Sequence, residues 1–228
     1  MDNTRMMRIA GILAVFGGVI NGFADYLLQG GLILGPAVNT YENLANVDYD
    51  LVFWGTIIGN AAIPLWLLGF WPVYVALAPA GRWFALPTVI LLGYGFSLFA
   101  GYHGSYALYA AGFQAEVATQ PAISDATSTL VTRLNEYHGA LLVLIGLTVP
   151  LGSLLFILVV LFRRTHYARW MIVCSPFVAF LTQGWIETLP APWGGVIRPA
   201  WSTTIFTLFF LLATIVTWNV KPNQSSSD

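Results

Sequence analysis

Ionisable side chains stand within or directly beside long apolar stretches of this sequence. Asp25, His103 and His138 lie in three of these stretches, and Glu187 directly follows a fourth. Because such groups are costly to place in a hydrocarbon environment, they commonly mark a relay, a pathway or a reactive site. Carboxyl and imidazole groups together can supply an acid and a base, so we expect these four residues to be catalytic.

Other polar residues recur near these four at helical spacing. Asn21, Asp25 and Gln29 are four residues apart and therefore share one face of a helix. Gln183 and Glu187 repeat this spacing, and Tyr106 follows His103 by about one turn. The residues that we expect to contact a substrate are Asn21, Asn60, Tyr106, Gln183, Arg198 and Trp201.

The elements that carry these residues are predicted to be transmembrane helices. The chain is 57% hydrophobic and only 8% charged, whereas a soluble domain carries about 25% charged residues, so an aqueous monomer is excluded. An apolar run of about 20 residues crosses a ~30 Å hydrocarbon core. Six runs meet or approach this length: 9–34, 51–77, 86–111, 137–162, 170–186 and 201–220. The predicted fold is all-α, a polytopic integral membrane protein with a six-transmembrane-helix bundle.

The basic residues predict how this bundle is oriented. If the six runs alternate in direction, seven of the nine Lys and Arg residues fall on one side, leaving only Arg133 and Arg198 on the other. An excess of basic residues marks the cytoplasmic side. The sequence thus predicts a multi-pass protein of the cell membrane, with both termini inside. We expect one domain over residues 1–220 and a disordered polar tail over 221–228.

The functional candidates are predicted to share one layer of the membrane. Asp25 lies sixteen residues past Ile9, which is ~24 Å along a helix and within the outer leaflet. The inner halves of the runs are almost entirely apolar, which favours a one-sided pocket over a conduit. The residues expected to point into this pocket are Asn21, Asp25, Asn60, His103, His138, Gln183 and Glu187.

Two segments have sequences that indicate irregular structure. The fifth run, 170–186, is short and is followed by three prolines, which predicts a tilted or broken helix. The longest outer loop is expected over 112–136, and Ser124 has the character of a helix cap that begins an extension into the fourth span.

Several kinds of chemistry have no signature here. The zinc patterns HExxH and CxxC, the nucleophile pattern GxSxG and the phosphate-binding loop are absent, and the single Cys174 excludes an internal disulfide framework. We expect no cofactor or metal, although a b-type haem between His103 and His138 remains an alternative. With a net charge of -1 and no long basic run, the chain is not expected to bind nucleic acid.

Stretches of the sequence resemble a known group of proteins. The stretches are GNAAIPLWLLGFWPVYVALAPAGRW (59–83), GYHGSYAL (101–108) and the run around Asp25. They are similar to a family of small, functionally uncharacterised bacterial membrane proteins. The resemblance implies a six-helix fold and no particular activity.

These observations favour a membrane-embedded acid/base enzyme acting on a lipophilic, isoprenoid or lipid-like substrate. Protonation leading to isomerisation or cyclisation fits an aromatic-rich wall, and hydrolysis is the nearest variant. The alternatives are a proton- or cation-coupled transporter, a lipophile-binding protein, or a structural subunit in which these polar groups only join helices. For Glu136, Glu187 and Arg198 a solvated position at the interface is the simpler interpretation. The expected partners are a lipophilic small molecule or lipid, the bilayer and, in an oligomer, further copies of the chain.

Overall fold

The computed structural model describes residues 3–31, 34–35, 43–44, 46–118 and 124–221. All regular elements within these ranges are helical, so the all-α prediction is confirmed. The long helices are α1 (Asn3–Leu28), α3 (Tyr49–Leu68), α5 (Arg82–Ala118), α6 (Ser124–Phe162) and α9 (Trp201–Thr217). The shorter elements are α4 (Phe70–Leu77), α7 (Phe177–Ile186), α8 (Trp193–Ile197) and the 3-10 helices η1 (Ala78–Ala80) and η2 (Arg169–Cys174).

Among the described residues, four segments are long and apolar enough to cross a membrane, whereas six were predicted. They are Asn3–Leu28, Tyr49–Ala80, Arg82–Ala118 and Ala126–Phe162. The sixth predicted run forms α9, of 17 residues. The fifth forms η2 and the 10-residue α7, with a break at Ser175 and Pro176. Since Pro176 has no N–H to continue a helical ladder, this run is divided into two shorter pieces.

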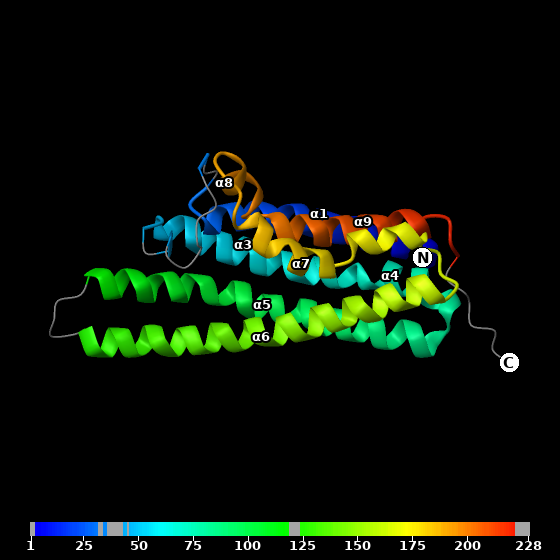
Figure 1. Cartoon of the computed structure of the whole chain (residues 1–228), viewed down its shortest axis with the longest axis horizontal. Coiled ribbons are helices and arrows are strands. Elements are labelled where there is room, and N and C mark those ends of the chain that lie inside the picture. The colour runs from blue at the N-terminus through cyan, green and yellow to red at the C-terminus, as the bar shows by residue number, and fades with distance from the viewer. Residues whose placement is uncertain (1–2, 32–33, 36–42, 45, 119–123, 222–228) are drawn as a thin grey trace.

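Consecutive segments run in opposite directions, so both described chain ends lie at the same end of the molecule (Figure 1). There Arg8 Nε donates a hydrogen bond to the Trp218 carbonyl at 2.7 Å, joining the start of α1 to the end of α9. The His166 amide donates to the Ala76 carbonyl at 2.9 Å, which brings the link after α6 to α4. At the opposite end, the Gly195 amide of α8 donates to the Gly35 carbonyl at 2.9 Å.

The end that holds the termini also gathers most of the positive charge, and we call it the basic end. Its residues are Arg5, Arg8, Arg82, Arg163, Arg164, Arg169 and Lys221, at the start of α1, the start of α5, the link after α6, the start of η2 and the segment that follows α9. Three of these arginines lie over aromatic rings: Arg8 over Trp218 at 5.0 Å, Arg82 over Trp83 at 5.9 Å and Arg163 over Phe84 at 4.2 Å. Such pairs anchor the cations beside aromatic side chains at an interface.

Helices α5 and α6 form a hairpin that extends past the other helices, away from the basic end (Figure 1). They have 37 and 39 residues, about 55 and 58 Å, well beyond a ~30 Å hydrocarbon core. The predicted extension from Ser124 is confirmed, but the predicted loop over 112–136 is wrong, because α5 continues to Ala118. No Gly or Pro follows Gly112 within α5 to stop the helix, and Gly112 packs closely against Val131 and Leu134 of α6.

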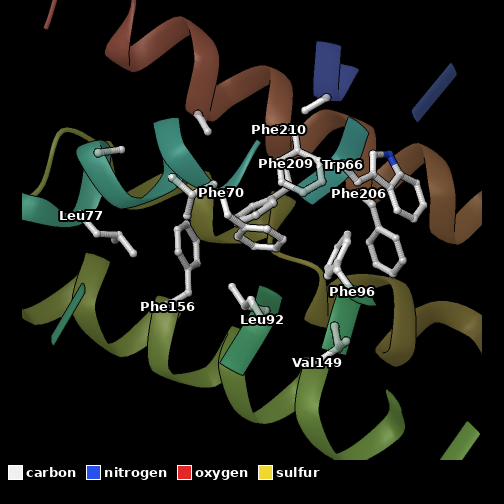
Figure 2. Close-up of a cluster of buried hydrophobic side chains, with 14 of the residues drawn as sticks. Trp66, Phe70, Leu77, Leu92, Phe96, Val149, Phe156, Phe206, Phe209 and Phe210 are labelled. Carbon is white, nitrogen blue, oxygen red and sulfur yellow. The ribbon is translucent and has the colours of Figure 1, made fainter. Parts of the chain in front are cut away.

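The middle of the bundle is filled by large aromatic side chains (Figure 2). Trp66, Phe96 and Phe206 are fully buried, with ring centroids 4.9 to 5.8 Å apart. The same packing continues toward the basic end through Phe70, Phe156, Phe209 and Phe210. We call these seven residues the aromatic cluster. Glycine is needed where α3 gives way to α4, because a Cβ on Gly69 would lie 2.5 Å from the Phe210 ring and 2.6 Å from Ala14.

Candidate functional site

A cavity of about 340 Å³ lies between the aromatic cluster and α8. Its lining comes from α1, α3, α5, α6, α7, the start of α9 and the link that precedes α9. Five of the seven residues predicted to share one cavity are in this lining, and they are Asn21, Asp25, His103, Gln183 and Glu187. Tyr106 and Arg198, expected as substrate contacts, line it as well.

Asp25 is held at the cavity wall by α9. The Thr203 hydroxyl donates a hydrogen bond to Asp25 Oδ2 at 2.5 Å, and Asn21 Nδ2 donates to the Thr203 hydroxyl at 3.2 Å. Because Asn21 and Asp25 are one turn apart on α1, both reach the same threonine. These three side chains form a directed chain of hydrogen bonds that ends on the carboxyl group.

His103 approaches the same carboxyl group from α5. Its Nε2 lies 3.5 Å from Asp25 Oδ1, and the exposed fractions of the two side chains are 6% and 14%. This separation is slightly longer than a formed N–H···O bond of ~2.7–3.2 Å, so a small shift of either side chain would make or break one. The position of the imidazole depends on Gly59, because a Cβ there would lie 2.7 Å from His103 Nδ1.

A second polar group stands at the α8 end of the lining. Arg198 Nη1 donates to Gln29 Oε1 at 3.4 Å, and Arg198 Nη2 lies 4.0 Å from Glu187 Oε1. Gln183 Nε2 donates to the same Glu187 oxygen at 3.0 Å. The Arg198 side chain is 12% exposed and that of Glu187 is 49% exposed, so the cation is the more enclosed partner. We call these four residues the charged rim.

Apart from Ser202, the remaining lining is apolar or aromatic. Trp66 and Phe206 of the aromatic cluster, together with Phe99, close the cavity on the side toward the basic end. Tyr102 and Tyr106 lie on α5, and the Tyr106 hydroxyl donates to the Tyr102 hydroxyl at 3.0 Å. An apolar molecule could therefore contact rings along most of its length and reach polar groups at two places, Asp25 with His103 and the charged rim.

His138 does not line this cavity, which corrects the expectation for its side chain. It is buried, and its Nδ1 lies 2.7 Å from the Ser105 hydroxyl. Its ring stacks on Tyr109 at 5.3 Å and packs against Tyr102 at 4.3 Å. Since Tyr102 is part of the lining, His138 sits one side chain behind the cavity wall.

Asn60 is likewise outside the cavity. Its side chain is exposed in a shallow groove that also contains Pro64, Ser97 and Ala100. Gly59 faces His103, and the next residue of a helix points about 100° away, so Asn60 is turned outward.

Trp201, the remaining predicted contact, does not line the cavity. Its Nε1 donates to the Thr182 hydroxyl at 2.8 Å, and this bond joins α9 to α7.

Sequence reasoning missed Thr203, which binds Asp25, and Tyr102, which separates His138 from the cavity. A signal for Thr203 existed in the sequence, because Gly18 and Gly22 on α1 have the same four-residue spacing as Thr203 and Thr207 on α9. In the structure a Cβ on Gly18 would lie 2.1 Å from Thr207, and one on Gly22 would lie 3.6 Å from Thr203. Threonines one turn apart on α9 thus face the smallest residues of α1. This pairing of small and hydroxyl residues is common where membrane helices approach closely.

No group of three or more His, Cys, Asp and Glu side chains is placed to hold a metal ion in the part of the chain that the structure describes. The two imidazoles considered for haem are directed to different partners. His103 lies by Asp25 and His138 by Ser105, and the Tyr106 ring packs against both imidazoles. The arrangement offers acid/base chemistry more directly than axial ligation.

The fold and the site define an all-α protein whose apolar, membrane-compatible helices line a partly open cavity with a carboxyl–imidazole pair in its wall. The chain belongs to the family described as "Family of unknown function (DUF6796)", which matches residues 1–223. This agrees with the resemblance to functionally uncharacterised proteins. No curated protein and no solved structure matches the chain.

Proposed function

We propose that this protein is a membrane-embedded acid/base enzyme that acts on a lipophilic substrate in the cavity. The observation that carries the proposal is the Asp25–His103 pair, 3.5 Å apart and largely enclosed, in the wall of a cavity otherwise rich in aromatic rings. A purely structural pair would need no adjoining space. Here the carboxyl group and the imidazole both reach a volume that a ligand can occupy.

The proposal includes an arrangement in the membrane. The six apolar segments cross a bacterial cell membrane with the basic end in the cytoplasm, as the clustering of seven basic residues there favours. Helix α9 and the η2–α7 segment cross the bilayer alongside the four longer spans. Pro176 interrupts the η2–α7 segment within the bilayer. The cavity then lies in the outer leaflet, from which a lipid-like substrate enters.

In the proposed reaction each side chain of the site has its own role. Asp25 delivers a proton to a double bond of the substrate, and the cation that forms lies among the rings of Trp66, Phe99 and Phe206, which attract positive charge. His103 removes a proton from a neighbouring carbon and returns it to Asp25, so the net reaction is an isomerisation or, with ring closure, a cyclisation. Thr203 and Asn21 are positioning residues that hold the carboxyl group. Hydrolysis by a water that His103 activates uses the same geometry.

The aromatic cluster favours this proposal over a transporter. Between the cavity and the basic end the core is formed mainly by Phe70, Phe156, Phe209, Phe210 and aliphatic side chains (Figure 2). The polar side chains buried among them carry hydroxyl groups, on Thr88, Ser153, Tyr167, Thr214 and Thr217, and among the described residues no Asp, Glu or His is buried in this part of the core. A coupled carrier needs polar groups or water along the whole path. A packed aromatic core on one side of the cavity suits a pocket with a single entrance.

The test uses Asp25→Asn to trap substrate. Wild-type protein and the variant are purified in the same detergent, and the bound lipophilic molecules are extracted and compared by chromatography and mass spectrometry. We expect the variant to retain a molecule that the wild type converts when it is added back, with a changed retention time for an isomer or a gain of water for hydrolysis. Thr204→Ala, at an exposed position on the same helix as Thr203, is the control. Conversion by Asp25→Asn at the wild-type rate would refute the role of Asp25.

A further inference from the structure

The cavity has two chemically different ends. Its apolar part is formed by Trp66, Phe99, Leu142, Ile145 and Phe206, and its opposite part by the charged rim. Asp25 lies on α1 and His103 on α5. The rim residue Gln29 follows Asp25 by one helical turn on α1, so the pair lies close to the charged rim. A molecule that fills this space must be amphiphilic, with its reactive carbon a short distance from its polar group.

The size of the cavity limits how many chains it can hold. Its volume of about 340 Å³ is near the lower end of the ~300–1,000 Å³ range of ligand pockets. That space suits one hydrocarbon chain with a small polar group. A two-chain phospholipid would have to leave one chain outside the cavity.

The charge of the rim favours an anionic headgroup. The guanidinium of Arg198 keeps its proton in proteins and presents several N–H donors in a plane, which matches the oxygens of a carboxylate or phosphate. The Arg198 side chain is only 12% exposed, so an anion beside it would be little screened by water. Glu187, which is 49% exposed, can turn toward solvent when an anion takes its place near Arg198.

The start of α9 adds to this preference. Ser202 and Thr203 belong to the first turn of a 17-residue helix and line the same cavity as Arg198. The first N–H groups of a helix lack partners within it and carry the positive end of the helix dipole. The helix dipole and the guanidinium thus both favour a bound anion, and Arg198 makes the larger contribution.

We propose that the cavity takes a single-chain amphiphile whose anionic headgroup, a carboxylate or a phosphate, binds Arg198 while its chain lies against the aromatic wall. The assignment rests on the proposed function, whose substrate class it names. The headgroup sets the register of the chain, and the register brings one carbon to Asp25 and His103. The charged rim is then the determinant of specificity.

The first test compares headgroups on one chain. Full-length protein in a non-ionic detergent is titrated with dodecanoate, dodecyl phosphate, dodecyltrimethylammonium and inorganic phosphate, and the dissociation constants are measured by native mass spectrometry. We expect at least one of the two anionic amphiphiles to bind tenfold or more tightly than the cationic one, and inorganic phosphate to bind more weakly than either. The stronger of the two anions identifies the headgroup. Preference for the cation, or equal binding of inorganic phosphate, would overturn the proposal.

The second test changes the rim. Arg198→Gln should weaken binding of the preferred anion at least tenfold and leave the cation unaffected, while Glu187→Gln should tighten anion binding because it removes a competing carboxylate. Arg133→Gln is the matched control, since Arg133 is a basic residue outside the cavity, 74% exposed and paired with Glu136. Unchanged anion binding in Arg198→Gln would refute the assignment. If that variant does not fold, the Glu187→Gln result decides, and weaker or equal anion binding there counts against the proposal.

The two proposals can fail separately. If anions bind through Arg198 but Asp25→Asn converts substrate normally, the headgroup site stands and the catalytic role of Asp25 is wrong. If Asp25→Asn traps a neutral or cationic molecule, the catalytic proposal stands and the anionic headgroup is wrong.

Discussion

Thr203 on α9 donates its hydroxyl hydrogen to Asp25 on α1 at 2.5 Å, across 178 positions of the sequence. The same hydroxyl accepts a hydrogen bond from Asn21. One threonine therefore uses its donor and its acceptor capacity at once, and it joins the last long helix to the first. Helix α9 is the shortest of the long helices, so this link fixes its position relative to the site.

Removing this hydroxyl should destabilise the protein. Thr203→Val keeps the volume but leaves a carboxyl oxygen and the Asn21 amide without their partner, and we expect a loss of about 2 kcal/mol in the free energy of unfolding. Thr203→Ser keeps the hydroxyl and loses one methyl group, at ~0.8 kcal/mol. Equilibrium unfolding in mixed micelles measures both. Equal losses for the two variants would mean that the hydrogen bonds contribute little.

Gly59 should be essential for the position of His103. In Gly59→Ala the new methyl group would lie 2.7 Å from His103 Nδ1 and 3.3 Å from Ala24, so the imidazole must move away from Asp25. We expect at least a tenfold loss of turnover, with folding retained. Gly146→Ala is the matched control, because a Cβ there meets no atom within 4 Å. Activity at the wild-type level in Gly59→Ala would show that the imidazole is not needed where it lies.

Much of the site followed from helical spacing, because a stripe on one helix depends only on the sequence of that helix. Asn21, Asp25 and Gln29 all line the cavity as their spacing predicted. Which face a helix turns to its neighbours depends on packing between helices, and the sequence does not encode it locally. Asn60 was misplaced for that reason: Gly59 faces the His103 ring, whereas Asn60 lies beside Gly104 on the part of α5 outside the cavity.

The elements of the fold were predictable to different degrees. Long apolar runs determined α1, α3, α5 and α6, since hydrophobic length is a strong signal. The end of α5 was predicted too early, because its last residues include Gln114 and Glu116 but contain no helix breaker. His138 illustrates a further limit. It packs next to the cavity wall, yet the tyrosine that separates it from the cavity lies on another helix, α5, and could not be deduced from the sequence of α6.

Tyr167, in the link between α6 and η2, gives a prediction about alkaline pH. Burial raises the pKa of its hydroxyl above the ordinary value of 10.0. Above pH 10 the unfolded chain releases this proton and the folded chain keeps it, so stability should fall as pH rises. Tyr167→Phe should reduce that fall and leave stability at pH 7 unchanged or slightly higher, because within the described ranges the hydroxyl has no hydrogen-bond partner. Tyr94→Phe, at an exposed position, is the control for losing one hydroxyl. Identical alkaline unfolding curves for Tyr167→Phe and wild type would contradict this.

The orientation in the membrane can be decided by cysteine labelling. In a Cys174→Ser background, His166→Cys lies at the basic end and Thr188→Cys near the charged rim, and both positions are exposed. We expect a membrane-impermeant maleimide to label position 188 in intact cells and position 166 only after lysis. The reverse pattern would place the basic end outside and the cavity in the inner leaflet.

Two substitutions of Asp25 distinguish its role in folding from its role in catalysis. Asp25→Asn keeps the shape of the side chain and an oxygen that accepts from Thr203, so we expect its unfolding free energy to stay within about 1 kcal/mol of wild type. Asp25→Leu removes every polar atom and leaves the Thr203 hydroxyl and His103 without this partner, at about 1–3 kcal/mol for each buried group. Unfolding in mixed micelles provides the comparison, and the substrate found by trapping provides the activity assay. Both variants should be inactive, but only Asp25→Leu should be clearly less stable. If Asp25→Asn were as unstable as Asp25→Leu yet still active, the carboxyl group would serve the structure, and Glu187 would become the candidate acid.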